Sequence, residues 1–192
     1  MGNAINAQKS NDMDSLTRLH RFRYHLAKGF IDVGDIVLDL GCGTGYGTKI
    51  LSEVALKVIG VDIDEENIRG DVLNNNGDNI EYLCKDLEKW DIPECDVAVQ
   101  FENLEHLYNP KKFVDRLKNK VDKYVVLSVP VGCEKLIEVN GKLQADLDLT
   151  HHSVFDTPEE LDNLFLDDKW RKFYGFRSGI IYIAVYYNNE QF

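Results

Sequence analysis

The chain has few cysteines, and their positions do not suggest cross-linking. Four cysteines are spread over 192 residues, and no two of them form a Cys-x-x-Cys pair: Cys42, Cys84, Cys95 and Cys133. This spacing gives neither a disulfide framework nor a zinc knuckle, so we expect reduced thiols. Long apolar runs are also missing, because no stretch approaches the roughly 18 residues of a membrane span, and residues 1–14 lack the apolar core of a secretion signal. These absences predict a cytoplasmic protein without a membrane partner.

Basic residues are the minority among the charged ones. The 22 lysines and arginines are outnumbered by 33 aspartates and glutamates, which gives a formal net charge of -11. Contacts to phosphates need a basic surface, so nucleic acid is not an expected partner, although a local basic patch could override the average. Hydrophobic residues make up 44% of the chain, enough for one full core. We therefore expect a single domain; the composition indicates no oligomeric state.

Apolar periodicity divides the chain into a leader and one domain. Residues 1–13 show no period, which predicts a flexible leader, and the domain is expected over residues 14–192. It begins with an amphipathic helix over residues 14–30, after which strand and helix patterns alternate. The expected strands cover 36–40, 57–61, 80–84, 96–101 and 123–129, and the helices 46–55, 65–74 and 111–118. This alternation predicts a doubly wound, Rossmann-like α/β sheet that is mostly parallel.

The C-terminal part breaks the alternation. A helix is predicted over residues 158–166, with Thr157 as N-cap, Pro158 at its first position and Glu160 completing a capping box. Residues 170–176 and 180–187 read as two strands joined by a tight turn. Such a short connection requires an antiparallel hairpin.

The most informative motif is a glycine-rich loop after the first strand. Residues 37–47 read Val-Leu-Asp-Leu-Gly-Cys-Gly-Thr-Gly-Tyr-Gly. Glycines permit close backbone approach, and the following helix directs its positive end at the loop, which predicts a cofactor cradle. A dinucleotide loop needs Gly-x-Gly-x-x-Gly, and its third glycine is replaced here by Tyr46 or Thr48, depending on the register. A nucleotide-dependent reductase is thereby disfavoured.

Asp62 ends the second predicted strand, 21 positions after Gly41. An acidic residue at this place in a Rossmann-like sheet accepts hydrogen bonds from ribose hydroxyls. Asp64 competes for the same role. The alternative is that the Asp-Ile-Asp run only caps the helix that starts near Glu65.

These features resemble class I S-adenosylmethionine (SAM) dependent methyltransferases, with a likeness that extends over residues 14–187. The resemblance implies a seven-stranded sheet ending in an antiparallel hairpin, with SAM as cofactor and S-adenosylhomocysteine (SAH) as product. It also places an acid after the third strand near the adenine amino group, although that acid could instead be a solvated loop residue. The implied cofactor-binding residues are Asp39, Gly41, Cys42, Gly43, Gly45, Asp62, Ile63, Asp86, Leu87 and Phe101.

The run from Glu102 to Leu107, Glu-Asn-Leu-Glu-His-Leu, matches the family's motif after the fourth strand. The match implies catalytic roles for Glu102, beside the methionine part of the cofactor, and for His106, facing the acceptor. Histidine suits proton removal from a hydroxyl near neutral pH. The competing view makes His106 a structural histidine in a short helix.

The segment from Asp148 to Pro158 is the candidate acceptor wall, with His151, His152 and Phe155 as substrate-binding residues. The adjacent histidines also invite a metal site with Cys133 or Asp148. We expect no metal, because neighbouring histidines usually point apart and no third ligand stands at helical spacing. Residues 131–148 have no clear period and are interpreted as an acceptor-specific insertion.

The first helix sharpens the likeness. Its Leu-His-Arg-Phe-Arg-Tyr run, residues 19–24, is similar to small methyltransferase domains of glycan and surface-polysaccharide modification. In these, an arginine can pair with the methionine carboxylate, a role that Arg23 or Arg21 would fill; the alternative is a solvated basic face. Phe22 and the Cys-Gly-Thr of residues 42–44 depart from the common pattern.

The leading hypothesis is a SAM-dependent methyltransferase that acts on a small hydroxyl-bearing acceptor, with a sugar or glycan favoured. The chain lacks an Asn/Asp-Pro-Pro-(Tyr/Phe) motif after the fourth strand, which counts against methylation of the amino groups of adenine, cytosine or glutamine. The alternatives are methylation of another small metabolite and a non-catalytic SAM-binding module.

Overall fold

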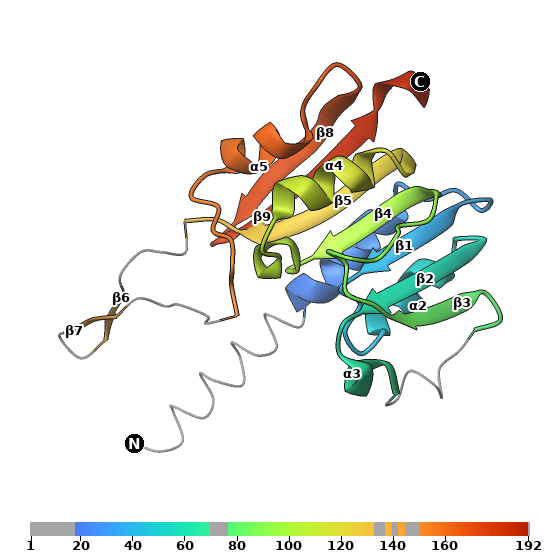
Figure 1. The fold of residues 1–192 in the computed structure, drawn as a ribbon, viewed down its shortest axis with the longest axis horizontal. Helices are drawn as coiled ribbons and strands as arrows, with labels where there is room; N and C mark the ends of the chain where they lie inside the picture. Colours follow the sequence, from blue (N-terminus) through green and yellow to red (C-terminus); the bar gives the residue numbers. More distant parts are fainter. Residues whose placement is uncertain (1–17, 70–76, 133–136, 140–141, 145–149, 192) are drawn as a thin grey trace.

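Seven strands form one sheet through the centre of the molecule (Figure 1). The computed structural model describes residues 18–69, 77–132, 137–139, 142–144 and 150–191. The strand order is β3-β2-β1-β4-β5-β9-β8. The bounds are β1 Ile36–Leu40, β2 Lys57–Asp62, β3 Ile80–Cys84, β4 Cys95–Phe101, β5 Val121–Pro130, β8 Trp170–Ser178 and β9 Ile181–Asn188. The first five strands pair in parallel, whereas β9 pairs antiparallel with β5 and β8. The predicted sheet and its C-terminal hairpin are confirmed.

The sheet separates two apolar cores. Successive side chains of a strand point to opposite faces, so Leu38 and Leu40 lie in one core and Val37 lies in the other. The first core is covered by α4 (Pro110–Lys118) and α5 (Pro158–Phe165), the second by the helix of residues 18–28 and by α2 (Tyr46–Ser52). Burial on both faces explains why the strands read as nearly continuous apolar runs.

The predicted helices are present, with shifted ends. α2 ends at Ser52 with Glu53 as its C-cap, three residues before the predicted end. α4 begins at Pro110, because the Asn109 side chain accepts the N–H of Lys112 at 3.0 Å and thereby caps it. α3 spans Glu65–Arg69, and residues 70–74 of its predicted helix lie outside the described residues.

The capping box predicted for α5 is not formed. Thr157 is the N-cap and Pro158 stands in the first turn, as predicted, but the Thr157 side chain makes no capping hydrogen bond. Glu160 Oε2 accepts the N–H of Asp156 at 2.9 Å. The glutamate therefore reaches one residue beyond the N-cap, and the reciprocal pair of bonds does not arise.

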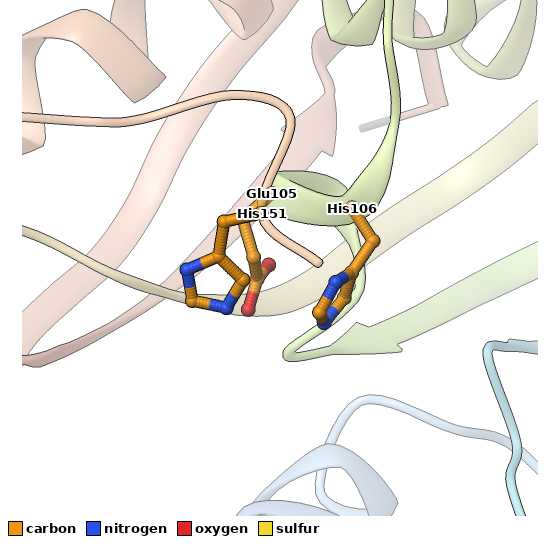
Figure 2. A group of neighbouring side chains, drawn as sticks. All are labelled: Glu105, His106 and His151. Atoms are coloured by element: carbon orange, nitrogen blue, oxygen red, sulfur yellow. The ribbon is translucent and has the colours of Figure 1, made fainter. Parts of the chain in front are cut away.

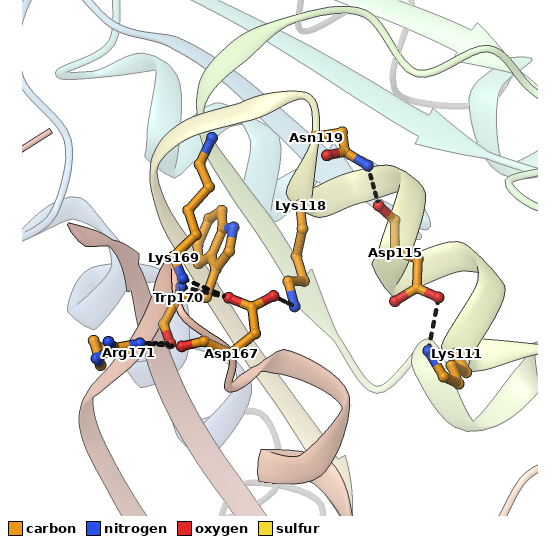
Figure 3. Close-up of polar contacts among 8 residues, drawn as sticks. All are labelled: Lys111, Asp115, Lys118, Asn119, Asp167, Lys169, Trp170 and Arg171. Atoms are coloured by element: carbon orange, nitrogen blue, oxygen red, sulfur yellow. Dashed lines mark hydrogen bonds and ion pairs between the residues drawn. The ribbon is translucent and has the colours of Figure 1, made fainter. Parts of the chain in front are cut away.

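The hairpin is fastened to α4 through Asp167 (Figure 3). The Asp167 carboxylate accepts the backbone N–H groups of Lys169 and Trp170 at 2.9 and 2.7 Å and pairs with the Lys118 ammonium. Burial opposes the charge of Asp167, but the Lys118 and backbone hydrogen bonds outweigh it, so the pKa of Asp167 is lowered. On the outer face of α4, Lys111 pairs with Asp115 at 2.8 Å. The contacts of Asp167 fix the start of β8 against α4.

Four further short elements lie in the described residues: the 3-10 helices η2 (Leu104–His106) and η3 (Asn189–Gln191), and the antiparallel strands β6 (Ile137–Val139) and β7 (Lys142–Gln144). The pair falls within residues 131–148, where the sequence shows no clear period. The predicted leader, together with Cys133 and Asp148, lies outside the described residues. Within the described ranges, no helix combines the length and apolar character that crossing a membrane requires.

Candidate functional site

A cavity of about 620 Å³ lies at the carboxyl ends of the parallel strands. Ligands of open α/β sheets bind at this edge, because the loops that follow neighbouring strands converge there. Its lining residues come from loops far apart in the chain: Gly41, Asp62, Ile63, Asp64, Asn67, Asp86, Leu87, Glu88, Glu102, Asn103, His106, Leu107, Tyr108, Thr150 and His152. The cavity therefore brings predicted cofactor and acceptor residues to one place.

Backbone hydrogen bonds, two of them to β2, hold the glycine-rich loop in shape. The N–H groups of Gly41 and Cys42 both donate to the carbonyl of Val61, at 2.8 and 3.0 Å, and the Gly45 N–H donates to Cys42 at 3.0 Å. Because these N–H groups are already bonded, they are not available to a ligand at these positions. Cys42 is buried, and burial raises the pKa of its thiol, which makes it a neutral packing residue.

Two of the motif's glycines make room for tyrosine rings. A Cβ at Gly47 would lie 1.9 Å from the ring of Tyr24, and one at Gly45 would lie 2.6 Å from the hydroxyl of Tyr82. Tyr82 also donates its hydroxyl proton to the Gly45 carbonyl at 3.2 Å. Sequence reasoning assigned the glycines to the cofactor and missed this packing role.

Asp39 lies behind the loop, outside the cavity lining. It is fully buried, and its carboxylate accepts the hydroxyls of Thr48 at 2.6 Å and Tyr24 at 3.2 Å. Burial raises the pKa of Asp39 to about 7, against the lowering effect of the two hydrogen bonds. Asp39 therefore ties α2 and the first helix to β1, and a contact to the cofactor stays a prediction.

Asp62 reaches the cavity from the end of β2. Its Oδ2 accepts the Gly43 N–H at 2.8 Å and its Oδ1 accepts the Asp64 N–H at 2.9 Å, so each oxygen keeps a lone pair for a ligand. Asp64 in turn accepts the N–H of Glu66 at 2.9 Å at the start of α3. The helix-capping alternative thus fits Asp64. The neighbouring Ile63 lines the cavity and is 70% exposed, which leaves an apolar surface uncovered.

The loop after β3 contributes Asp86 and Leu87. Asp86 accepts the Lys89 ammonium at 2.6 Å and the Glu88 N–H at 3.0 Å. The bond from Lys89 is the largest of the effects that lower the pKa of Asp86, so this carboxylate stays ionised at neutral pH. Leu87 is buried, and its carbonyl accepts Arg116 at 2.6 Å, which fixes the loop against α4.

The Arg23 side chain is buried, and its Nη1 is bonded to other residues of the protein. The side chain is 1% exposed, and its Nη1 donates to Glu102 Oε1 and to Ser128 Oγ, both at 2.7 Å. The guanidinium also lies 5.6 Å from the ring centre of Phe101, a buried member of the second core. Arg23 and Phe101 are outside the cavity lining, while Glu102 is part of it. In this arrangement Arg23 positions Glu102, whose φ of 50° is an uncommon backbone conformation.

Two segments build the acceptor end of the cavity. The N–H groups of His152 and Ser153 both donate to the Glu105 carbonyl at 2.9 Å, which docks residues 150–153 onto η2. His106 Nδ1 lies 3.0 Å from the Thr150 carbonyl. A carbonyl can only accept, so Nδ1 carries a proton, and in the neutral imidazole Nε2 then holds the lone pair. His106 does stand in a short helix, yet it also lines the cavity.

Of the predicted acceptor residues, His152 lines the cavity and Phe155 does not. The His152 ring stacks on Tyr108 with centres 3.9 Å apart and an angle of 13°. Phe155 is 5% exposed and lies in the first core, and it bridges to Val131. His151 packs edge-on against His106 at 4.9 Å, next to the lining.

Sequence reasoning missed several lining residues, including Asn67, Glu88 and Tyr108. Position alone offered a signal for Tyr108, because it follows the predicted motif after the fourth strand by one residue. Thr150 lies within the segment predicted as the acceptor wall, and the docking of residues 150–153 onto η2 brings it to the cavity.

Comparisons with known proteins agree with this geometry. A protein named "Probable S-adenosylmethionine-dependent methyltransferase" of Mycolicibacterium smegmatis is 34% identical over 83 residues, which is 42% of this chain and 32% of that protein. The ubiquinone biosynthesis O-methyltransferase of Coxiella burnetii is 34% identical over 116 residues, 57% of this chain and 42% of that enzyme. The chain thus spans less than half the length of these curated relatives.

A solved structure shares the fold of this chain. The solved DhpI-SAH complex superposes with a TM-score of 0.65 and 22% identity, over 96% of this chain and 90% of that one. At this identity the likeness speaks for the fold alone. The sequence profile of a family described as methyltransferase domain matches residues 14–168. The chain therefore belongs to this family of methyltransferase domains.

Proposed function

We propose that residues 14–192 act as one domain that transfers a methyl group from SAM to a hydroxyl of a small acceptor. One observation carries the proposal: a single cavity is lined by Gly41 of the glycine loop and Asp62 on one side and by His106, whose Nδ1 is turned to the Thr150 carbonyl, on the other. The profile match and the names of the relatives support the reaction class.

SAM is proposed to lie along the first three strand ends. The free lone pairs of Asp62 would accept both ribose hydroxyls, and Asp86 would accept the adenine amino group. Ile63 and Leu87 would cover the adenine faces with apolar surface. The methionine part would lie beside Gly41, Glu102 and Asn103, which line the cavity together.

The chemistry asks the protein for alignment and for removal of one proton. The acceptor oxygen attacks the methyl carbon, the carbon–sulfur bond breaks, and its electron pair stays on sulfur to give SAH. His106 Nε2 is the proposed group that takes the hydroxyl proton. Holding oxygen, methyl and sulfur in line supplies much of the rate.

A sugar or glycan-linked hydroxyl is the proposed acceptor. The Tyr108–His152 stack offers a flat aromatic surface at the cavity, with polar groups around it. Aromatic faces of this kind can cover the apolar face of a sugar ring. Another small metabolite is the alternative acceptor, and a non-catalytic SAM-binding module is the alternative function. The free thiols of Cys42, Cys84 and Cys95 support a reducing, cytoplasmic setting.

Calorimetric titration with SAH tests the cofactor site, with NAD as control ligand. We expect SAH to bind and NAD not to bind. Asp62→Ala should weaken SAH by about a hundredfold or more, because hydrogen bonds to a charged group contribute about 1.5–3 kcal/mol each. Asp64→Ala is the matched control and should retain most of the affinity.

Transfer from methyl-labelled SAM then tests the reaction, with sugars, phenols and amines as acceptors. Label on a hydroxyl supports the proposal, and label on an amine alone contradicts it. SAH binding without any transfer would favour the binding module.

A further inference from the structure

Three metal-ligand side chains meet beside the acceptor end of the cavity (Figure 2). Glu105 and His106 come from η2, and His151 comes from the segment docked onto it. One ligand atom from each lies within 4.8 Å of the others. Glu105 is buried, whereas the two histidines are partly exposed, so the cluster has a protein side and an open side.

The cluster is held by the backbone around it. The Glu105 carbonyl accepts the N–H groups of His152 and Ser153, and Ser153 Oγ donates to the Leu107 carbonyl at 2.8 Å. These bonds place His151 next to η2. The Thr150 carbonyl accepts His106 Nδ1–H, and such a bond on the far nitrogen is the usual support of a metal-bound histidine.

The ligand set has a definite chemical preference. Two imidazole nitrogens and one carboxylate hold catalytic zinc and leave a coordination position open. Imidazole suits zinc, iron and related transition cations, whereas magnesium prefers oxygen ligands. Ligand atoms on a tetrahedral zinc lie roughly 3.4 Å apart for bonds of about 2.1 Å. Modest side-chain rotations from the present spacing would close the set.

We propose that Glu105, His106 and His151 bind a divalent transition cation of the zinc type at the wall of the cavity. From the residue pattern alone, the metal site to consider was His151 and His152 with Cys133 or Asp148. The structure joins His151 to a different pair, from a loop 45 positions away. Since His106 also lines the cavity, the open position of the ion faces the acceptor.

A catalytic role for the ion rests on the proposed function. The acceptor hydroxyl would bind at the open position and lose its proton to water, because a bound cation lowers the pKa of such a group. The resulting oxygen would attack the methyl carbon as before, releasing SAH. With the ion bound, His106 is a ligand and no longer the direct proton acceptor.

Metal binding is tested first, without reference to activity. Tag-free protein is stripped with chelator, dialysed, and titrated with Zn²⁺ and Mn²⁺, with Mg²⁺ as the hard-cation control. We expect one Zn²⁺ per chain. His151→Asn and Glu105→Gln should each weaken it at least about tenfold, because even outer residues of such sites cost 10–100-fold.

His25→Asn is the matched control, an exposed histidine outside the cluster that should leave binding unchanged. Glu105 is buried, so thermal unfolding of Glu105→Gln is measured alongside, and the partly exposed His151 supplies the variant that keeps its fold. Absence of stoichiometric Zn²⁺ binding, or binding that survives both variants, overturns the site.

Measurements of SAH affinity and of methyl transfer distinguish a failure of the metal proposal from a failure of the proposed methyltransferase function. Activity that is lost on chelation and restored by Zn²⁺ or Mn²⁺, with SAH affinity unchanged, supports the catalytic role. Full activity after chelation overturns that role and leaves His106 as the direct base. Stoichiometric zinc in a protein that methylates no hydroxyl would support the site and overturn the proposed function instead.

Discussion

The two ends of the cavity are built in different ways. At the cofactor end, the bonds from Gly41 and Cys42 to Val61 join the ends of two adjacent strands, β1 and β2. At the acceptor end, η2 is contacted by residues 150–153, which come from the chain between β7 and α5, more than 40 positions after η2. The first end follows from the parallel sheet itself; the second depends on one docked segment. The acceptor end is therefore the part that can change while the fold is kept.

The largest expected effect tests whether the ends act separately. His106→Ala should lower kcat by about 10²–10⁴-fold, the usual contribution of a positioned proton acceptor, and loss of a metal ligand would act in the same direction. SAH affinity should stay unchanged, because the cofactor is held from the other strand ends. Steady-state kinetics and SAH calorimetry check this, and a parallel loss of SAH affinity would mean that the two ends are coupled.

Phe155→Ala tests what its predicted place in the acceptor wall means. The ring is buried in the first core, so truncation should lower the free energy of unfolding by about 3–5 kcal/mol. Tyr108→Ala is the contrasting variant: Tyr108 is 74% exposed, so its loss should raise the acceptor KM with little change in stability. Urea unfolding and acceptor kinetics separate the two, and a stable Phe155→Ala with raised KM would restore the sequence prediction.

Gly47→Ala tests the packing of the cofactor end. The added Cβ would collide with the Tyr24 ring, so we expect a loss of about 1–3 kcal/mol in unfolding free energy. Gly34→Ala is the control, because its Cβ would meet nothing within 4 Å. Tyr24→Leu in the Gly47→Ala background should recover part of the loss in thermal unfolding. If Gly47→Ala instead weakens SAH binding at full stability, the glycine serves the ligand directly.

Asp39 gives the most gradual effect, a pH dependence. The pKa of Asp39 rises from 3.8 to about 7 on folding, so the folded state keeps the proton over this range. Stability from this group is complete below pH 3.8 and is lost as the pH rises through about 7, by at most about 1.4 kcal/mol per unit. Asp39→Asn should remove this slope in urea unfolding measured across that range. Asp115→Asn, at an exposed position, should keep it.

The cofactor end could be predicted from the sequence because its contacts join loops that follow neighbouring strands of the sheet. A glycine loop after β1 and an acid after β2 lie side by side in any parallel sheet that pairs these strands, so Asp62 and Gly43 meet without further information. Whether a segment forms a helix or a strand was also predictable, because the spacing of its apolar residues reflects which of its faces is buried. Helix ends were less so, because side-chain caps such as Asn109 decide them.

Arg23 shows where the prediction stopped. Its place on the first helix suggested that it binds the cofactor. In the structure, Arg23 binds Glu102, which follows β4, and Ser128, which lies in β5. A buried guanidinium needs such partners, and they lie 79 and 105 positions away. No periodicity in the sequence encodes that meeting.

By itself, the sequence determined the doubly wound sheet, its antiparallel hairpin and the residues at the strand ends, because apolar period and glycine spacing express local backbone preference. Only the tertiary structure decided which residues share the acceptor end. It took Phe155 into the core and set Tyr108 against His152. It also joined His151 to Glu105 and His106, since those contacts arise from the docking of residues 150–153 onto η2, which no local pattern specifies.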